Sequence, residues 1–116
     1  MFLTLTQVAI GGAIGSVLRY LTVFAVGAPL ATALVNIVGS FLMGVLFITL
    51  SKTTLSPLLM TGIMGGFTTF SAFSLDAWKL WQTGQSAIAL LYVAGSVVIS
   101  LLAVALGAAL TQRFLP

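Results

Sequence analysis

Polar side chains that recur at every fourth residue are the first feature of this sequence that could do chemistry. Two sets of this kind are present: Thr32, Asn36 and Ser40, and then Tyr92, Ser96 and Ser100. A spacing of four places each set on one face of a helix. All six groups are neutral, and their hydroxyl and amide hydrogens can donate to an anion. Neither set contains the carboxylate that is expected along a cation path.

Asn36 is the most demanding member of these two sets. Serine and threonine can bond back to a carbonyl of their own helix, so their presence alone predicts little. The amide of Asn36 needs several partners in an apolar medium. It therefore either joins two helices or lines a pore, and its position leaves both alternatives open.

A second candidate for chemistry is the run of residues 65–74, GGFTTFSAFS. Two glycines followed by β-branched and hydroxyl residues make a poor helix interior, so a helix is expected to break here. A break inside a bilayer frees backbone groups, which can bind ions at helix ends. The alternative is a merely kinked helix in which Thr and Ser bond to the preceding turn.

Phe70 and Phe73 lie within this run and are three residues apart. They share a face if the chain is helical after the break. The edge of an aromatic ring is electropositive, so two ring edges could hold a small anion without a full positive charge. Lipid contact or packing is the ordinary role of such residues, and the spacing by itself favours it.

The elements that must position these residues are transmembrane helices. Of the 116 residues, 60% are hydrophobic and only 4% are charged, whereas soluble domains carry about 25% charged residues. Four stretches reach the roughly 20 apolar residues that a spanning helix needs. They predict one transmembrane domain, residues 1–116, with spans at about 2–26, 30–50, 55–81 and 86–110.

The few charges are divided almost evenly between the two faces of this bundle. Four spans place Lys52 and Arg113 on one side, and Lys79 and a snorkelling Arg19 on the other. Orientation normally follows an excess of Lys and Arg on the cytoplasmic side. Because there is almost no excess, the chain can insert both ways, which allows an antiparallel dimer. Four scattered cations also make no basic patch for nucleic acid.

Small residues four apart are expected to hold the helices together. Gly11 and Gly15, Ser40 and Gly44, and Gly62 and Gly66 form such pairs, which allow close backbone approach in lipid. At the start of the third span, Ser56 is expected to be the N-cap and Pro57 the first helical residue.

Besides a path for anions, the sequence allows three other functions to different degrees. A proton-coupled multidrug exporter needs an intramembrane carboxylate, but the only acid is Asp76, where a surface ion pair with Lys79 is the simpler account. A non-conducting structural subunit would use the glycines and polar stripes as interface. An enzyme is not expected, because cysteine, histidine and paired carboxylates are lacking.

Taken together, the motifs resemble those of the Fluc, or CrcB-type, fluoride channels over nearly the whole chain. Residues 11–20 (GGAIGSVLRY) and 32–41 (TALVNIVGSF) resemble the signatures of the first two spans. Residues 65–74 resemble the third-span signature, which is the most specific. Tyr92, Ser96 and Ser100 match the polar positions of the fourth span. Two residues depart from the family pattern: Ala72 replaces a common Thr, and Asp76 replaces a common Glu.

The resemblance implies an all-α membrane protein that forms an antiparallel, dual-topology homodimer with two fluoride pathways. It would export fluoride passively through the inner membrane of a bacterial cell. The implied pathway residues are Asn36, Thr69, Phe70, Phe73, Tyr92, Ser96 and Ser100. Arg19 would lie in an aqueous vestibule. The backbone carbonyls of Gly65 and Thr68 would hold a structural sodium ion (Na+) at the dimer centre.

A sodium ion at such a break is also reasonable from elementary chemistry. Two carbonyls from one subunit are too few ligands for a hard cation, but a two-fold axis would double them. A buried cation needs a cage of this kind to offset the loss of its hydration.

Overall fold

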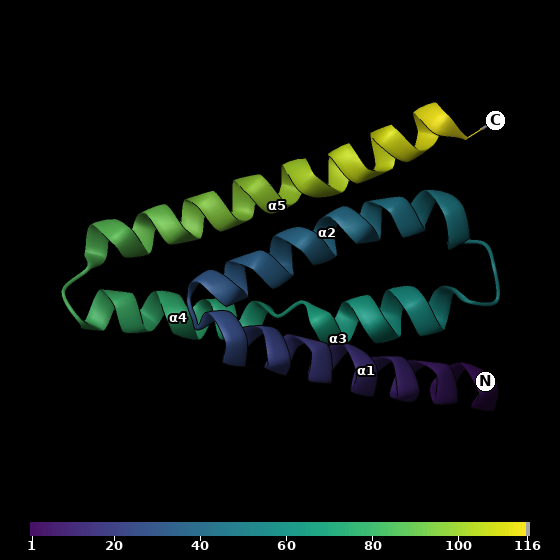
Figure 1. Cartoon of the computed structure of the whole chain (residues 1–116), viewed down its shortest axis with the longest axis horizontal. Helices are drawn as coiled ribbons and strands as arrows, with labels where there is room; N and C mark the ends of the chain where they lie inside the picture. Colours follow the sequence, from purple (N-terminus) through teal and green to yellow (C-terminus); the bar gives the residue numbers. More distant parts are fainter. Residues whose placement is uncertain (116) are drawn as a thin grey trace.

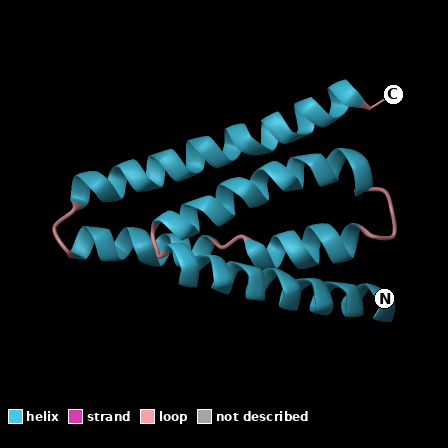
Figure 2. Ribbon diagram, viewed as in Figure 1, coloured by secondary structure: helices cyan, strands magenta, loops and turns pink. Residues whose placement is uncertain are grey.

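The computed structural model describes residues 1–115, and these fold into helices joined by short turns, without strands (Figures 1 and 2). Four helical segments are long and apolar enough to cross a membrane, as expected. Their elements are α1 (Phe2–Val26), α2 (Leu30–Leu50), a third segment made of η1 (Pro57–Met64), α3 (Gly65–Phe67) and α4 (Phe70–Gln82), and α5 (Ser86–Phe114). The fourth span continues beyond the expected Leu110 to Phe114. Pro116 of the expected domain lies outside the described residues.

Glycines with positive φ mark two of the turns between these segments. Gly27 follows α1 with a φ of 86°, and Gly84 follows α4 with a φ of 79°. Such values favour residues without a Cβ atom, so these positions let the chain leave a helix and reverse over two or three residues. Figure 1 shows both chain ends at the same end of the molecule, as four antiparallel segments require.

The segments are arranged as two closely packed pairs. One pair is α1 against η1 and α3, and the other is α2 against α5 (Figure 1). In the first pair, a methyl group added to Gly62 would lie 2.8 Å from Cα of Gly11, and one added to Gly15 would lie 2.8 Å from the nitrogen of Phe67. Glycine is therefore needed along this seam, as the four-residue spacing predicts.

The α2–α5 pair has a similar backbone contact, but only near the end of α2. A methyl group on Gly44 would overlap the carbonyl oxygen of Val104, and one on Gly107 would overlap that of Phe41. Ser40, four residues before Gly44, lines a pocket beside this contact.

The third segment changes conformation twice. Its first part, η1, is a wide π-type helix, and the amide of Gly65 reaches back to the carbonyl of Met60. Thr68 (ψ 158°) and Thr69 (φ −154°, ψ 116°) are then extended before α4 begins, and Figure 2 shows them as a short loop. We call these two residues the third-segment bend.

At the start of this segment Pro57 is the first helical residue, but the expected cap by Ser56 is absent. The side chain of Ser56 makes no capping bond; its hydroxyl donates to the sulfur of Met60 instead.

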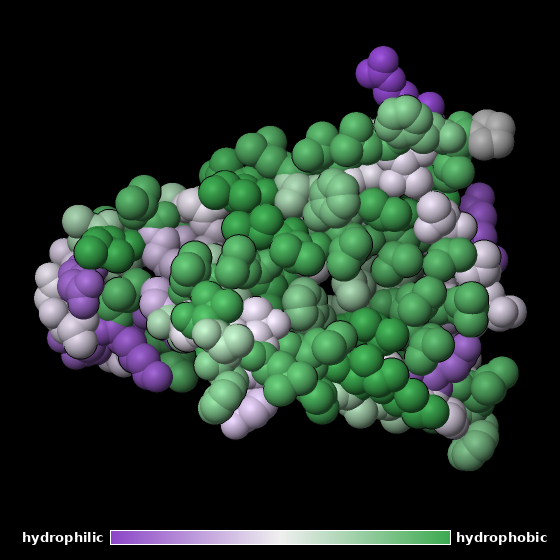
Figure 3. Space-filling model, in the orientation of Figure 1, coloured by the Kyte–Doolittle hydropathy of each residue, from purple (hydrophilic) through white to green (hydrophobic). Residues whose placement is uncertain are grey.

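The outer surface is almost entirely apolar, as Figure 3 shows for the visible face. Large hydrophobic side chains are exposed along all four segments. Fully buried side chains of any kind are few, and the largest are Val35 and Thr32. This distribution suits a lipid solvent, in which apolar side chains gain nothing by leaving the surface.

Candidate functional site

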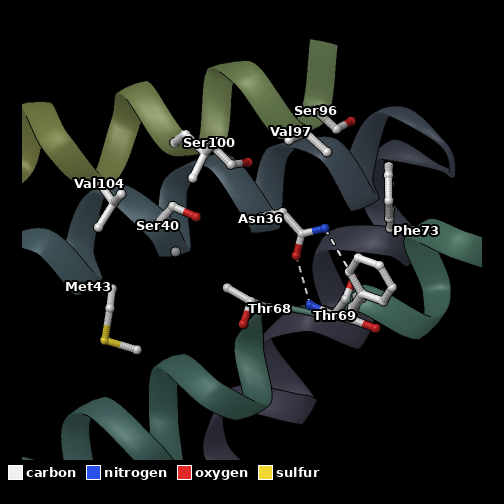
Figure 4. A pocket seen from close by; sticks show the side chains of 13 residues that line it. Asn36, Ser40, Met43, Thr68, Thr69, Phe73, Ser96, Val97, Ser100 and Val104 are labelled. Carbon is white, nitrogen blue, oxygen red and sulfur yellow. Dashed lines mark hydrogen bonds between the residues drawn. The ribbon is translucent and has the colours of Figure 1, made fainter. Parts of the chain in front are cut away.

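A side-opening pocket with polar groups in its lining lies between α2, the third-segment bend and α5. Its volume is about 400 Å³. The lining residues are Asn36, Gly39, Ser40, Met43, Thr68, Thr69, Phe70, Phe73, Ser96, Val97, Ser100, Leu101 and Val104 (Figure 4). The lining contains hydroxyls, one amide and two phenyl rings, but no charged side chain. We call it the central pocket.

Asn36 joins α2 to the third-segment bend by two hydrogen bonds. Its Nδ2 donates to the carbonyl oxygen of Thr69 at 3.1 Å, and the amide nitrogen of Thr69 donates to its Oδ1 at 2.7 Å (Figure 4). The side chain thus pairs with an extended backbone as a neighbouring strand would. One Nδ2 hydrogen is left over. Asn36 therefore joins two segments, which is one of the alternatives left open by the sequence, and it also lines the central pocket.

The two threonines of the bend are held by their own hydroxyls. Thr68 Oγ1 donates to the carbonyl of Met64 at 3.0 Å, which closes the preceding helical turn. Thr69 Oγ1 accepts from the amide of Ala72 at 3.1 Å and caps the first turn of α4. Because an N-cap residue has extended dihedrals, Thr69 both ends the bend and begins the next helix.

Phe70 and Phe73 lie together at one side of the central pocket. Their ring centroids are 5.5 Å apart with an interplanar angle of 56°, so the two rings are tilted against each other. Phe73 is buried, with 7% of its surface exposed, whereas Phe70 is 77% exposed. Phe70 therefore lies at the open side of the pocket, where one copy of the chain leaves it uncovered.

Ser96 and Ser100 bring two hydroxyls to the same pocket from α5 (Figure 4). Ser96 is 8% exposed. The Oγ of Ser100 is buried and has no hydrogen-bond partner within the described chain. Most buried hydroxyls in proteins are bonded, so an unbonded one beside a cavity marks a place where something else can bond.

Tyr92, the first member of the α5 stripe, lies outside the central pocket and behind Phe73. Its ring packs on that of Phe73 with centroids 5.4 Å apart, and its hydroxyl donates to Oδ2 of Asp76 at 3.3 Å. Asp76 is only 9% exposed. The expected surface ion pair of Asp76 with Lys79 is therefore wrong: the carboxylate is buried, and its hydrogen-bond donor is Tyr92.

Arg19 also lies outside the pocket lining. Its Nε donates to the carbonyl oxygen of Gly66 at 3.0 Å, so the guanidinium is tied to the backbone just before the third-segment bend. This contact replaces the expected snorkelling of Arg19 to a membrane face, because a carbonyl freed near the end of α3 offers the cation a nearer partner.

Gly65 is exposed, near the bend but not in the central pocket. In a continuous helix its carbonyl would accept from the amide of Thr69. That amide donates to Asn36 instead, so Gly65 loses its helical donor. No cluster of three acidic, histidine or cysteine side chains that could hold a metal exists in residues 1–115.

Sequence reasoning missed the apolar part of the lining: Gly39, Met43, Val97, Leu101 and Val104. One signal could have found two of them. Val104 continues the four-residue series after Ser100, and Met43 lies one turn after Ser40. Apolar residues in an apolar helix give no contrast, so only their register with the hydroxyls distinguishes them.

Comparison with known proteins assigns the chain to a family. Residues 6–108 match the family described as CrcB-like protein, Camphor Resistance (CrcB). The chain belongs to the CrcB family. A relative from Cereibacter sphaeroides is 47% identical over 99% of both chains, and one from Paracoccus denitrificans is 51% identical over 90% of both. A third, from Saccharophagus degradans, is 42% identical over 91% of this chain and 87% of its own. Each of these relatives is named a fluoride-specific ion channel FluC.

Proposed function

We propose that this CrcB-family protein is a fluoride-selective passive channel of the cell membrane, which exports fluoride and so lowers its cytoplasmic concentration. The CrcB relatives that carry the name fluoride-specific ion channel are similar over nearly the entire chain, which supports this function. The structural support comes from the central pocket and the groups that line it.

The unbonded hydroxyl of Ser100 is the observation that carries the proposal. It is buried at the wall of a pocket that also contains Asn36 and Ser96 and lacks any charged side chain. A passing fluoride ion can accept the hydrogen bond that the fold does not provide. Because the donors are neutral, they can compensate part of the lost hydration without holding the ion so tightly that it stops.

Phe70 and Phe73 fit the same role. Both rings line the pocket, and Phe70 remains exposed in the single chain. Ring edges stabilise an anion more weakly than a cationic side chain would, so the ion can leave again. In this proposal Tyr92, whose ring packs on Phe73, lies near one end of the pathway.

The exporter alternative is disfavoured by the position of the only acid. Asp76 lies outside the central pocket and shares a separate cavity of about 230 Å³ with Lys79. A cationic substrate needs a carboxylate in its own cavity, without an ammonium group beside it. The structural-subunit alternative gives no reason for a buried hydroxyl without a partner at a cavity wall.

We further propose that two copies form the antiparallel homodimer. The central pocket opens to the side, and Phe70 lies uncovered at that opening, so a second copy could complete the wall. With Arg19 bonded to Gly66, the opposite ends still carry nearly balanced charge, with Lys52 and Arg113 at one and Lys79 at the other. This balance supports insertion in both orientations.

The third-segment bend is, in this proposal, a true helix break with a sodium ion at the dimer axis. Gly65 is exposed and has lost its helical amide donor to Asn36, so its carbonyl is suited to be a ligand together with that of Thr68. Two copies would supply four carbonyl oxygens, the ligand type that hard cations prefer. The ion would add a fixed positive charge near both anion pathways and hold the two bends together.

Efflux from liposomes tests the channel function. Purified protein is reconstituted into vesicles loaded with potassium fluoride, valinomycin is added, and fluoride release is followed with an electrode beside a chloride-loaded control. Fast fluoride release without chloride release is expected. Absence of fluoride release from correctly folded protein would contradict the channel function and favour a structural subunit.

Two variants test the pathway in the same assay. Phe70→Ile is expected to abolish most of the flux because it removes a ring edge. Asn36→Asp should do the same, because it replaces a donor by an anionic acceptor. The control for the first is Phe24→Ile, since Phe24 is an exposed residue of α1 outside the pocket. Its flux should equal that of the wild type.

The dimer and its ion are tested separately. Gln85→Cys places the only cysteine of the chain in the α4–α5 turn. An impermeant thiol reagent should label about half of it in intact cells if both orientations are present. Labelling of all or none would contradict dual topology. Replacing sodium by a large organic cation on both sides should slow fluoride release, and unchanged release would contradict the sodium site.

A further inference from the structure

The hydroxyls of the central pocket stop at one end, where two apolar side chains face the cavity. Val104 lies four residues after Ser100 on α5, and Met43 lies three residues after Ser40 on α2. Figure 4 shows both on the opposite side of the pocket from Phe73 and Ser96. We infer that Met43 and Val104 form an apolar constriction that limits the rate of fluoride passage, an inference that rests on the proposed channel function.

The helices are in direct backbone contact immediately beside these two residues. A methyl group on Gly44 would overlap the carbonyl oxygen of Val104 itself and lie 2.8 Å from the nitrogen of Ala108. On α5, Gly107 is packed in the same way on the backbone of Phe41. The backbones of α2 and α5 therefore touch at this level, and the side chains of Met43 and Val104 line the cavity beside the contact. An ion that leaves the pocket in this direction would pass these two side chains.

Free hydroxyl donors are also missing from α2 and α5 beyond the constriction. The next hydroxyl on α2 after Ser40 is Thr49, nine residues later, and the next on α5 after Ser100 is Thr111, eleven residues later. At 1.5 Å per residue these intervals are about 13 and 16 Å long. Both hydroxyls are already used, since Thr49 donates to the carbonyl of Val45 and Thr111 to that of Gly107.

These features make the two ends of the pocket unequal. At the Phe73 end, an ion meets two ring edges, the Ser96 hydroxyl and the amide of Asn36. At the Met43 end the ion must lose part of its hydration, and the side chains of Met43 and Val104 offer no hydrogen bond in return. Hydrophobic constrictions of this kind restrict passage by excluding water. The constriction therefore limits the rate of transport together with the donors that precede it.

The decisive substitution is Val104→Thr, because threonine has nearly the same shape as valine and adds one hydroxyl. It extends the α5 series to Ser96, Ser100 and position 104. In the liposome assay, fluoride release should rise about tenfold, as a hydrogen bond made only at the barrier would give. Chloride release should stay at background, since the substitution does not widen the pocket.

Val98→Thr is the matched control. Val98 is 54% exposed on α5 and does not line the pocket, so the same change of side chain there should leave fluoride release unaltered. Val104→Leu provides the opposite change. It adds apolar volume at the constriction and should slow release below that of the wild type.

Met43→Gln repeats the test on α2 with a side chain of similar length. Its fluoride release tests the constriction if Val104→Thr cannot be purified as a folded protein. Faster release in either variant supports the constriction. Wild-type rates in both folded variants would overturn it while leaving the channel function intact. No fluoride release from the wild type would instead overturn the proposed function itself.

Discussion

The two helix pairs of this protein are built from similar apolar sequences but are packed for different purposes. Between α1 and η1–α3, glycines bring backbones into contact along the seam, and two polar side chains, Gln7 and Arg19, donate to backbone carbonyls across it. Between α2 and α5, the backbones also touch at Gly44 and Gly107, but one side of this pair forms a wall of the central pocket. A seam without a pocket holds the fold, whereas one that borders a pocket leaves room for an ion.

The difference lies in where polar groups obtain their partners. On α1, Thr6 and Thr22 bond to carbonyls of their own helix, so nothing is left for a ligand. At the central pocket, the Ser100 hydroxyl is left without a partner, and Asn36 makes two hydrogen bonds with the third-segment bend. Polar residues in an apolar helix thus become functional only where the neighbouring helix stands away from them.

The largest expected effect is on the seam between α1 and η1–α3. Gly15→Val should prevent recovery of folded protein, because even a methyl group at this position would lie 2.8 Å from the nitrogen of Phe67. Overpacking of this kind costs about 3 kcal/mol or more. The measurement is the yield of monodisperse protein after detergent extraction. Gly95→Ala is the control, since a methyl group at Gly95 meets nothing within 4 Å. Equal yields of the two variants would show that the close backbone contact at Gly15 is not needed for folding.

Asn36→Leu tests the junction between the two pairs. It leaves the amide and carbonyl of Thr69 without their partners on α2, at a cost of about 1–3 kcal/mol for each buried group. The thermal unfolding temperature in detergent should fall clearly, and fluoride release should be lost. A variant with wild-type stability would mean that the bend is held by other contacts.

Ser100→Ala should separate function from stability. Because the Ser100 hydroxyl has no partner in the fold, its removal should change the free energy of unfolding by less than about 0.5 kcal/mol. Fluoride release should nevertheless fall about tenfold, as expected when one donor to the ion is lost. Thr111→Val serves as a comparison, since its hydroxyl bonds within α5. Unchanged release in Ser100→Ala would remove this residue from the pathway.

Tyr92→Phe is expected to have the smallest effect on fluoride release. The ring keeps its packing on Phe73, and the bond from the hydroxyl to Asp76 is lost. Stability should fall by about 1 kcal/mol, the typical value for one hydrogen bond. A fall in fluoride release much greater than in Ser100→Ala would show that the Tyr92–Asp76 pair contributes more to transport than the central pocket does.

Much of the architecture follows from the sequence alone. The lengths of the apolar stretches predict four spanning helices, because a bilayer of fixed thickness demands about 20 residues from each. Gly11, Gly15 and Gly62 predict close packing, because only small residues allow backbone contact in lipid. Residues 65–74 predict a weak helix because glycine and β-branched residues disfavour it, and Thr68 and Thr69 are extended.

Only the tertiary structure decided which polar residues face one another. A four-residue period defines a helix face but not what that face meets: Ser40 lines the pocket, as its stripe suggested, whereas Tyr92 of the second stripe does not line it and packs on Phe73. The partners of Asn36 and Arg19 are 33 and 47 residues away along the chain. Hydrogen bonds over such separations depend on how whole helices pack, and local residue patterns carry no information about that.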